Sequence, residues 1–250
     1  MAATVDIVKL NYGEEKRQTT AQEHPYGQVG MNNDGRGYVY VFMDGAVTAG
    51  KLLQTPVTAV EHDMDLVTAA AAVGAITISV TLGALLAAAD LYKDGYLYVN
   101  DGPGEGQLFK IDTHVAVASS GTFAVPIRDE GGVRTALTAT SLCGLFKNPY
   151  KDVIVAPTTF TGSIVGATTR DMSDNNFGWA QRKGMAALLA KGTIVRGGMV
   201  QRGNATTTDI AGAVEQADYA STVEDQIVGV ASNIIAVDTD YTFVHMTLPL

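Results

Sequence analysis

The sequence contains little cysteine, little tryptophan and few charged residues. The shortage of cysteine excludes a disulfide-stabilised fold, and the shortage of basic charge argues against binding to nucleic acids or membranes. Among its 250 residues there is one cysteine, Cys143, so no internal disulfide can form and the fold must be stabilised by packing. Cys143 stands in the apolar stretch 142–146, where we expect a buried small side chain in preference to a reactive thiol.

Charged residues account for only 17% of the chain, and 26 acidic residues outnumber 17 basic ones, which gives a net charge of −9. The basic residues form no run. Because phosphate groups are bound by clustered Lys and Arg, we expect neither a nucleic acid nor a membrane as partner. Hydrophobic residues make up 46%, which argues against disorder over most of the chain and allows one large domain or two smaller ones.

A long uncharged segment, residues 66–89, does not have the pattern of a membrane helix. Between 76 and 82, Ile, Val or Leu alternates with Thr or Ser, which is the period of a strand with one buried face. We predict a turn or short helical piece at 69–73 and a strand at 75–82. The first eleven residues lack the basic start and apolar core of a signal peptide, so we expect a soluble protein made in the cytoplasm.

The remaining strand signals are frequent, short and separated by glycine turns, which predicts a mainly β protein. We expect antiparallel strands in sandwich-like or barrel-like modules. Only two alanine-rich segments, 82–92 and 184–191, suggest helix. The other predicted strands are 38–42, 51–60, 96–100, 107–111, 114–118, 122–127, 153–156, 193–195, 199–201, 226–231 and 241–247.

The predicted organisation has three parts. Residues 1–36 are polar and form an extended N-terminal arm, either a mobile tail or an arm that orders against a neighbouring subunit. Residues 37–160 form a β domain and 161–250 a second β module, unless the two are one domain. A faint similarity between 46–53 and 188–195, in which a glycine turn precedes an apolar strand, weakly supports two related modules.

The four histidines, at positions 24, 62, 114 and 245, show no metal-ligand spacing with one another or with the cysteine. His62 stands between Glu61 and Asp63, a group able to bind a cation but more typical of a solvated loop. His114 and His245 fall in predicted strands, so we interpret them as structural. We therefore predict no metal site and no cofactor.

The sequence evidence for other catalytic or ligand-binding sites is equally weak. The glycine-rich segment 101–107 lacks the Lys-Ser/Thr of a phosphate loop and places Glu105 where phosphate would sit, so it predicts a hairpin turn. The carboxylate pairs Asp63/Asp65 and Asp238/Asp240 would serve a glycosidase only if a cleft joined them. No nucleophile elbow, zinc-protease or kinase motif occurs. We expect no catalytic residue and a protein that is not an enzyme.

Three parts of the sequence are distinctive. Residues 91–107 read Leu-Tyr-Lys-Asp-Gly-Tyr-Leu-Tyr-Val-Asn-Asp-Gly-Pro-Gly-Glu-Gly-Gln, and residues 147–159 read Lys-Asn-Pro-Tyr-Lys-Asp-Val-Ile-Val-Ala-Pro-Thr-Thr. The third part begins Phe177-Gly178-Trp179-Ala180-Gln181 and continues through 192–195 to 228–231. Together they resemble virion proteins of tailed bacteriophages, of the capsid decoration (cement) type. The resemblance covers roughly residues 90–250 and carries no catalytic signature.

The resemblance implies a structural protein on the outer surface of a phage head, bound to the major capsid protein as a symmetric homotrimer. Its location would be the virion, after synthesis in a host bacterium. The arm would lie across neighbouring capsid subunits, so deletion of residues 1–36 would weaken attachment and leave the β domain folded.

Two alternatives remain open. One is a fibre, spike or tail β-domain that binds a glycan or protein of the host surface, with Tyr96, Tyr98 and Trp179 as exposed aromatic contacts. For Trp179, the only tryptophan, burial in a core is favoured over an interface or a carbohydrate platform. The other alternative, a hydrolase of the cell envelope, has the least support.

Overall fold

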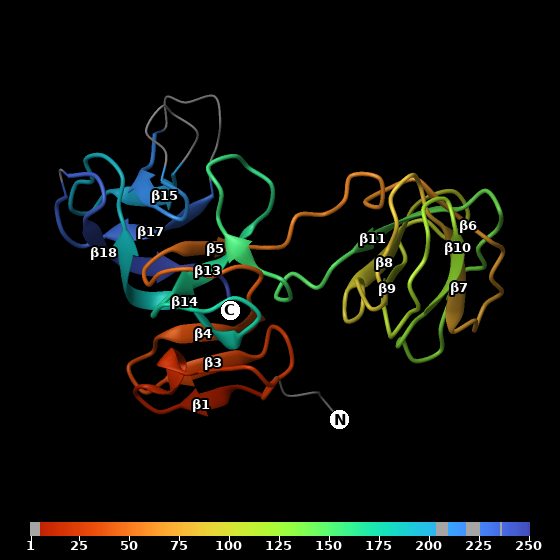
Figure 1. The fold of residues 1–250 in the computed structure, drawn as a ribbon, viewed down its shortest axis with the longest axis horizontal. Coiled ribbons are helices and arrows are strands. Elements are labelled where there is room, and N and C mark those ends of the chain that lie inside the picture. Colours follow the sequence, from red (N-terminus) through yellow and green to blue (C-terminus); the bar gives the residue numbers. More distant parts are fainter. Residues whose placement is uncertain (1–5, 204–209, 219–225, 236) are drawn as a thin grey trace. The chain divides into compact units, whose positions relative to one another are not determined.

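The computed structural model describes residues 6–203, 210–218, 226–235 and 237–250. These residues form eighteen strands and one short 3-10 helix, so the prediction of a mainly β protein is confirmed. The chain divides into two compact units (Figure 1). Unit 1 comprises Met1–Pro56 and Pro149–Leu250, and unit 2 comprises Val57–Asn148.

This division differs from the predicted boundaries at 36 and 160. The chain leaves unit 1 after β5 (Leu52–Gln54) and returns to it before β12 (Ile154–Val155). The two strands then pair with each other, Leu53 opposite Val155. A boundary at 160 would separate β5 from its other neighbour, β13 (Ile164–Thr168), with which it also pairs. Long-range strand pairing therefore decides the division.

Unit 1 contains a twelve-stranded sheet. Its main path runs β1-β3-β4-β14-β18-β17-β15-β16, and β2, β5, β12 and β13 join it at the side. The remaining bounds are β1 (Val8–Leu10), β2 (Gln18–Thr19), β3 (Val29–Asn32), β4 (Gly37–Phe42), β14 (Phe177–Leu189), β15 (Met199–Arg202), β16 (Val214–Gln216), β17 (Ile227–Ala231) and β18 (Tyr241–Thr247).

The described part of the predicted arm, residues 6–36, belongs to the body of unit 1. Strand β1 pairs in parallel with β3, which pairs with β4, and the 3-10 helix η1 (Glu14–Lys16) lies between β1 and β2. Leu10 is 3% exposed in an aromatic cluster. The prediction of an extended arm is therefore wrong. The segment is mostly polar, but its few apolar residues are enough to pack against the edge of the core.

Strand β14 replaces the helix predicted at 184–191. It pairs with β4 along its first half and with β18 along its second half. At Gly184 the φ angle is +85°, and the register shifts between Gln181 and Lys183, which accommodates a bend in this long strand. Hydrogen bonding to β4 and β18 outweighs the helix propensity of the alanines, because helix propensities are small and tertiary contacts often override them.

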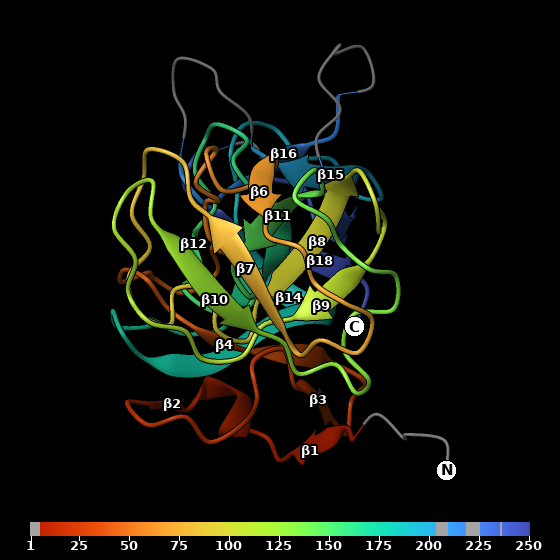
Figure 2. The same cartoon turned by 90° about the vertical axis from the view of Figure 1, so that its right-hand side faces the viewer.

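Unit 2 contains a six-stranded sheet in the order β10-β7-β6-β11-β8-β9 (Figure 2). One hydrophobic core lies within it. A bridge between Ile111 and Ile127, next to the two edge strands, curls the sheet towards a barrel. The bounds are β6 (Leu66–Thr68), β7 (Thr77–Thr81), β8 (Tyr96–Asp101), β9 (Leu108–Lys110), β10 (Thr122–Pro126) and β11 (Leu142–Phe146).

Most predictions within unit 2 are confirmed. The alternation at 75–82 corresponds to β7, in which Ile78 and Val80 are fully buried. Strands β8 and β9 pair as the predicted hairpin. Two predictions are wrong, since residues 82–92 form turns and extended chain where a helix was expected, and 114–118 forms only a single bridge at Val117.

Both units repeat one local arrangement, which we call the paired turn. Two distant residues exchange both backbone N–H···O=C hydrogen bonds, at 2.8–3.0 Å, and seven of these eight residues lead into a strand five or six residues later. The pairs are Val47/Met172 and Ile194/Ile235 in unit 1, and Ala71/Leu137 and Ala87/Val117 in unit 2.

The paired turns share a left-handed residue. At six of the eight positions the third residue after the bridge has a positive φ, and its N–H donates to a carbonyl of the partner segment. Gly50 and Gly197 occupy this position, as do Gly74, Asp90, Ser120 and Asn175. The similarity predicted between 46–53 and 188–195 is therefore out of register, because the equivalent segments are 47–52 and 194–199.

Candidate functional site

Trp179 lies in an aromatic cluster of unit 1, on strand β14. Its side chain is 5% exposed and packs with Leu10, Tyr38, Tyr40 and Phe177, so the prediction of a core position is confirmed. Its ring centroid lies 5.1 Å from that of Tyr40, in an edge-on arrangement. The alternation of β4 and β14 places these side chains on one face, where rings at this spacing attract one another.

A small cavity of about 210 Å³ opens beside this cluster. Its aromatic lining is completed by His24, whose ring centroid lies 5.2 Å from that of Trp179. Four charged residues also line it: Lys9, Glu14, Arg17 and Glu23. Arg17 Nη2 lies 3.4 Å from Glu23 Oε1. The sequence predicted Trp179 but none of these charged residues, which come from the segment expected to be an arm.

Hydrogen bonds hold the charged rim of the cavity in place. The backbone N–H of Asn11 donates to Glu14 Oε2 at 2.7 Å, and this bond lowers the pKa of the Glu14 carboxyl below its ordinary value. The backbone N–H of Glu23 donates to the Tyr40 hydroxyl at 3.1 Å. The rim therefore offers an ionised carboxylate at Glu14 and ring groups that are fixed by the fold.

His62 is buried, which contradicts its interpretation as part of a solvated loop. It is 1% exposed within unit 2, and its Nε2 lies 3.1 Å from the carbonyl oxygen of Leu85. Its Nδ1 is hydrogen-bonded to the hydroxyl of Tyr92. The backbone N–H of Tyr92 in turn donates to His114 Nε2 at 3.0 Å. Burial raises the pKa of the Tyr92 hydroxyl far above its ordinary value.

These contacts make His62, Tyr92 and His114 one hydrogen-bonded group inside unit 2. His114 Nδ1 donates to the carbonyl of Val115 at 2.9 Å, so both ring nitrogens of His114 are engaged. Both ring nitrogens of His62 are engaged as well. The interpretation of His114 as structural is consistent with this arrangement, and neither imidazole has a nitrogen left to act on a substrate in this state.

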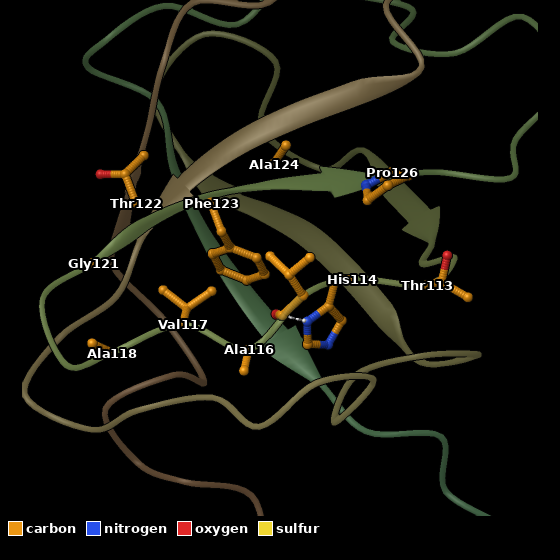
Figure 3. Close-up of a pocket in the computed structure, with 11 residues that line it drawn as sticks. Thr113, His114, Ala116, Val117, Ala118, Gly121, Thr122, Phe123, Ala124 and Pro126 are labelled. Atoms are coloured by element: carbon orange, nitrogen blue, oxygen red, sulfur yellow. Dashed lines mark hydrogen bonds between the residues drawn. The ribbon is translucent and has the colours of Figure 1, made fainter.

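Unit 2 also has an open cavity of about 670 Å³, lined by residues 113–118, 121–124 and 126 (Figure 3). The side chains of His114, Val117 and Phe123 converge in it, and the dashed line in Figure 3 marks the bond from His114 to Val115. Most of the lining is apolar, with Ala116, Ala118, Ala124 and Pro126 along its edges. This cavity therefore lacks the convergent polar groups that orient a ligand.

The remaining sequence candidates have structural partners. Asp65 Oδ1 accepts a hydrogen bond from Asn100 Nδ2 at 2.7 Å, and the backbone carbonyl of Asp63 accepts one from Tyr98. Asp238 accepts from the backbone N–H of Gly192. Neither carboxylate pair lines either cavity described above. Within the described residues, no three His, Cys, Asp or Glu side chains gather as metal ligands.

Cys143 lies in β11 and is fully buried, as predicted. Burial raises the pKa of its thiol to about 12. The aromatic residues proposed as glycan contacts are not brought together in one unit, since Tyr96 and Tyr98 lie on β8 of unit 2. The ring of Tyr96 is covered by Lys110, whose Nζ lies 4.1 Å from the ring centroid. Of the three aromatic residues, only Trp179 lines a cavity described here.

One face of the unit 1 sheet carries several exposed apolar side chains. Strand β18 alternates along its whole length, with Val244 and Met246 buried and Tyr241 and Phe243 48% and 47% exposed. Across the sheet, Val230 of β17 stands opposite His245, and Met199 of β15 stands opposite Val230. We call the four exposed residues Met199, Val230, Tyr241 and Phe243 the strand-face patch.

No helix in the described ranges has the length and apolar character needed to cross a bilayer. Comparisons of the chain with protein-family models, with curated proteins and with solved structures found no match.

Proposed function

We propose that this chain is a structural virion protein of the capsid-decoration type. It attaches to the outer surface of a phage head through the major capsid protein and stabilises the assembled shell. The resemblance of residues 90–250 to such proteins suggests the class, and the acidic net charge of −9 would keep the free protein dispersed before assembly.

The strand-face patch is the observation that carries the proposal. A monomeric protein exposes scattered apolar residues, but neighbouring large ones on adjacent strands mark a protein-binding surface. Tyr241 and Phe243 lie two residues apart on one face of β18, and Met199 is joined to that face through Val230. Aromatic and methionine side chains are enriched at the centres of protein interfaces.

The partner in this proposal is the major capsid protein, and the protein itself forms a homotrimer. Decoration proteins that cover a shell lie at its three-fold positions, where a trimer repeats the same contact three times. Repetition strengthens attachment without a larger contact per subunit, because the second and third contacts form within one complex.

The first test is the copy number of the 26.2 kDa chain in purified particles, measured against the major capsid protein. A ratio near one supports a protein that covers the shell. A handful of copies would point instead to a fibre, spike or tail position, and absence from the particle would remove the proposal.

A second test addresses the patch itself. Phe243→Lys should weaken binding to undecorated capsids, because it places a charge at the centre of the apolar face. Leu86→Lys is the matched control, since Leu86 is 64% exposed and lies in unit 2, outside the patch. Equal binding by both variants would show that the patch is not the attachment surface.

A further inference from the structure

The chain contains four Asp-Gly pairs, all within the part that the structure describes. They are Asp34-Gly35, Asp44-Gly45, Asp94-Gly95 and Asp101-Gly102. An aspartate followed by glycine can react with its own backbone, because glycine has no side chain to block the approach of the carboxyl group to the next nitrogen. Which pair reacts in the folded protein depends on where the N–H of each glycine points.

In three of the pairs, the glycine N–H donates to a group other than the carboxylate that precedes it. The acceptors are the carbonyl of Asn32 for Gly35 at 3.1 Å, Oδ1 of Asp174 for Gly45 at 2.7 Å and the carbonyl of Tyr92 for Gly95 at 2.9 Å. Arginines also hold two of these aspartates, since Arg36 Nε lies 2.8 Å from Asp34 Oδ2 and Arg128 pairs with Asp94. Each of these three nitrogens is thus directed away from the carbon that it would have to attack.

The fourth pair, Asp101-Gly102, has a different geometry. The N–H of Gly102 donates to Oδ1 of Asp101 itself, at 2.7 Å, and Cγ of Asp101 is one bond from that oxygen. Loss of the N–H proton leaves an electron pair on the nitrogen that points in the same direction, towards the carboxyl group. Asp101 is also exposed, so water reaches it. Reacting groups held in contact react faster than groups that must first find each other.

The fold holds this geometry in place. Asp101 is the last residue of β8 and lies opposite Leu142 of β11. Gly102 has φ of +78°, and a Cβ there would lie 2.6 Å from the carbonyl oxygen of Thr140. Only glycine fits this position, and in this conformation its N–H turns back to the side chain of Asp101.

We propose that Asp101 is a modification site, at which the protein converts its own aspartate to isoaspartate. The nitrogen of Gly102 forms a bond to Cγ of Asp101, and one carboxyl oxygen leaves as water. That water takes one proton from the N–H and one from the carboxyl group or, where the carboxyl is ionised, from solvent. Water then adds to the succinimide ring. Addition at Cγ regenerates aspartate, whereas addition at the main-chain carbonyl carbon breaks the original peptide bond and leaves the chain joined through Cγ.

The modification should affect unit 2. Isoaspartate adds one carbon to the main chain at the end of β8, where Asp101 pairs with β11 and the hairpin to β9 begins. The added carbon disturbs this pairing, so we expect a lower unfolding temperature for unit 2 and an unchanged one for unit 1. The site does not depend on capsid attachment and lies in a different unit from the strand-face patch.

Incubation of the purified full-length protein in water enriched in heavy oxygen tests the proposal. The protein is then digested, and electron-transfer mass spectrometry of the Asp-Gly peptides distinguishes isoaspartate from aspartate. We expect isoaspartate and heavy oxygen to accumulate at Asp101 about tenfold or more faster than at Asp34, Asp44 or Asp94. A parallel incubation in urea removes the fold, and there the four rates should converge.

Variants connect the reaction to its effect on stability. Asp101→Glu would have to close a larger ring, so it should form no product at this position and should keep the unfolding temperature of unit 2 during incubation. Asp44→Glu is the matched control, since Asp44 is exposed in an Asp-Gly pair of unit 1. It should leave both the reaction at Asp101 and the decline of unit 2 unchanged. Samples of each variant taken before incubation show whether the substitution itself disturbs the fold.

Three results would overturn the proposal. Absence of isoaspartate at Asp101 in the folded protein removes the site. Equal rates at the four pairs in the folded protein would mean that the direction of the Gly102 N–H has no effect. A preference for Asp101 that persists unchanged in urea would make the sequence, and not the fold, its cause.

Discussion

The two units are built from the same local arrangement but obtain their strands from the chain in different ways. Each contains two paired turns, and each has its own buried core. All strands of unit 2 come from the single segment Val57–Asn148. In unit 1, the pairing of β4 with β14 joins parts of the chain that lie on either side of that segment. The comparison shows that the same local turn geometry can join segments that are close together or far apart in the sequence.

The units also differ in how they treat buried polar rings. In unit 2 the ring nitrogens and hydroxyl of His62, Tyr92 and His114 are all engaged with one another or with backbone groups. In unit 1 the ring nitrogens of His24 and the indole of Trp179 have no partner within the described ranges, and both line a cavity. Clustered aromatic and histidine side chains thus form a closed hydrogen-bonded group in one unit and line a small cavity in the other.

Deletion of residues 1–36 should have the largest effect and should act on unit 1 alone. It removes β1, β2 and β3, exposes the edge of β4 and takes Leu10 out of the aromatic cluster. We expect calorimetry to show loss of the unit 1 transition and retention of the unit 2 transition. Residues 57–148 expressed alone serve as the reference for unit 2. A truncated protein with both transitions intact would restore the arm predicted from sequence.

Matched substitutions in the two cores should show that the two units unfold independently. Leu52 in unit 1 and Leu97 in unit 2 are both fully buried in strands. We expect Leu52→Ala and Leu97→Ala each to lower the free energy of unfolding by about 2–5 kcal/mol, through lost contacts and the cavity left behind. Each variant should shift only the transition of its own unit in chemical denaturation. A joint shift of both transitions would mean that the units unfold together.

Tyr92→Phe should sharpen the contrast between the two ring clusters. It removes a buried hydroxyl and leaves His62 Nδ1 without its partner, so we expect unit 2 to lose about 1–3 kcal/mol. Tyr40→Phe in unit 1 is the comparison, because its hydroxyl accepts from Glu23 at a partly exposed site where water can replace it. Urea denaturation measures both, and an equal loss would argue against a closed group in unit 2.

The left-handed positions of the paired turns allow a test within unit 1. Gly197 has φ of +78° and open space where a Cβ would lie, so Gly197→Ala should cost about 1–2 kcal/mol from backbone strain alone. At Gly50 the same Cβ would lie 2.5 Å from the ring of Tyr241, so Gly50→Ala should cost more. Melting temperatures of the unit 1 transition rank the two variants, and the reverse order would contradict this account.

Mildly alkaline pH, up to about 9, should produce the smallest effect, and it should begin in unit 2. The pKa of Cys143 is about 12 in the fold, against roughly 8.5 in an unfolded chain, so the unfolded state loses its proton first. The thiol contributes no pH dependence below about pH 8.5, and above it the stability of unit 2 should fall by up to about 1.4 kcal/mol per pH unit.

Burial also raises the pKa of Tyr92 in unit 2 and of Tyr38 in unit 1, so unit 1 should follow only when an unfolded tyrosine begins to ionise, near pH 10. Unfolding followed from pH 7 to 10.5 tests this order, with Cys143→Ala as the control that should lose the early decline. Native Cys143 should also resist alkylation at pH 8 and react once the chain is unfolded.

The alternation of apolar and polar residues was sufficient to predict a strand wherever that strand has one buried face. The prediction of 241–247 matches β18 in both bounds, and 96–100 matches β8 except for one residue, because alternation at period two is written directly into the residues. The glycine turn between β8 and β9 was predictable for the same local reason. Burial of Cys143 also followed from its apolar neighbours.

Tertiary structure decided the features that depend on partners far along the chain. Strand β14 is rich in alanine, and only the edges of β4 and β18 make it a strand. His62 is polar with acidic neighbours, yet Tyr92 and Leu85 give it hydrogen bonds that make burial possible. The cavity of unit 1 joins β1, η1 and β4 to β14, residues separated by more than a hundred positions. Sequence patterns show the local periodicity of a chain. Which distant residues come together depends on which strand edges pair, and no local pattern encodes that pairing.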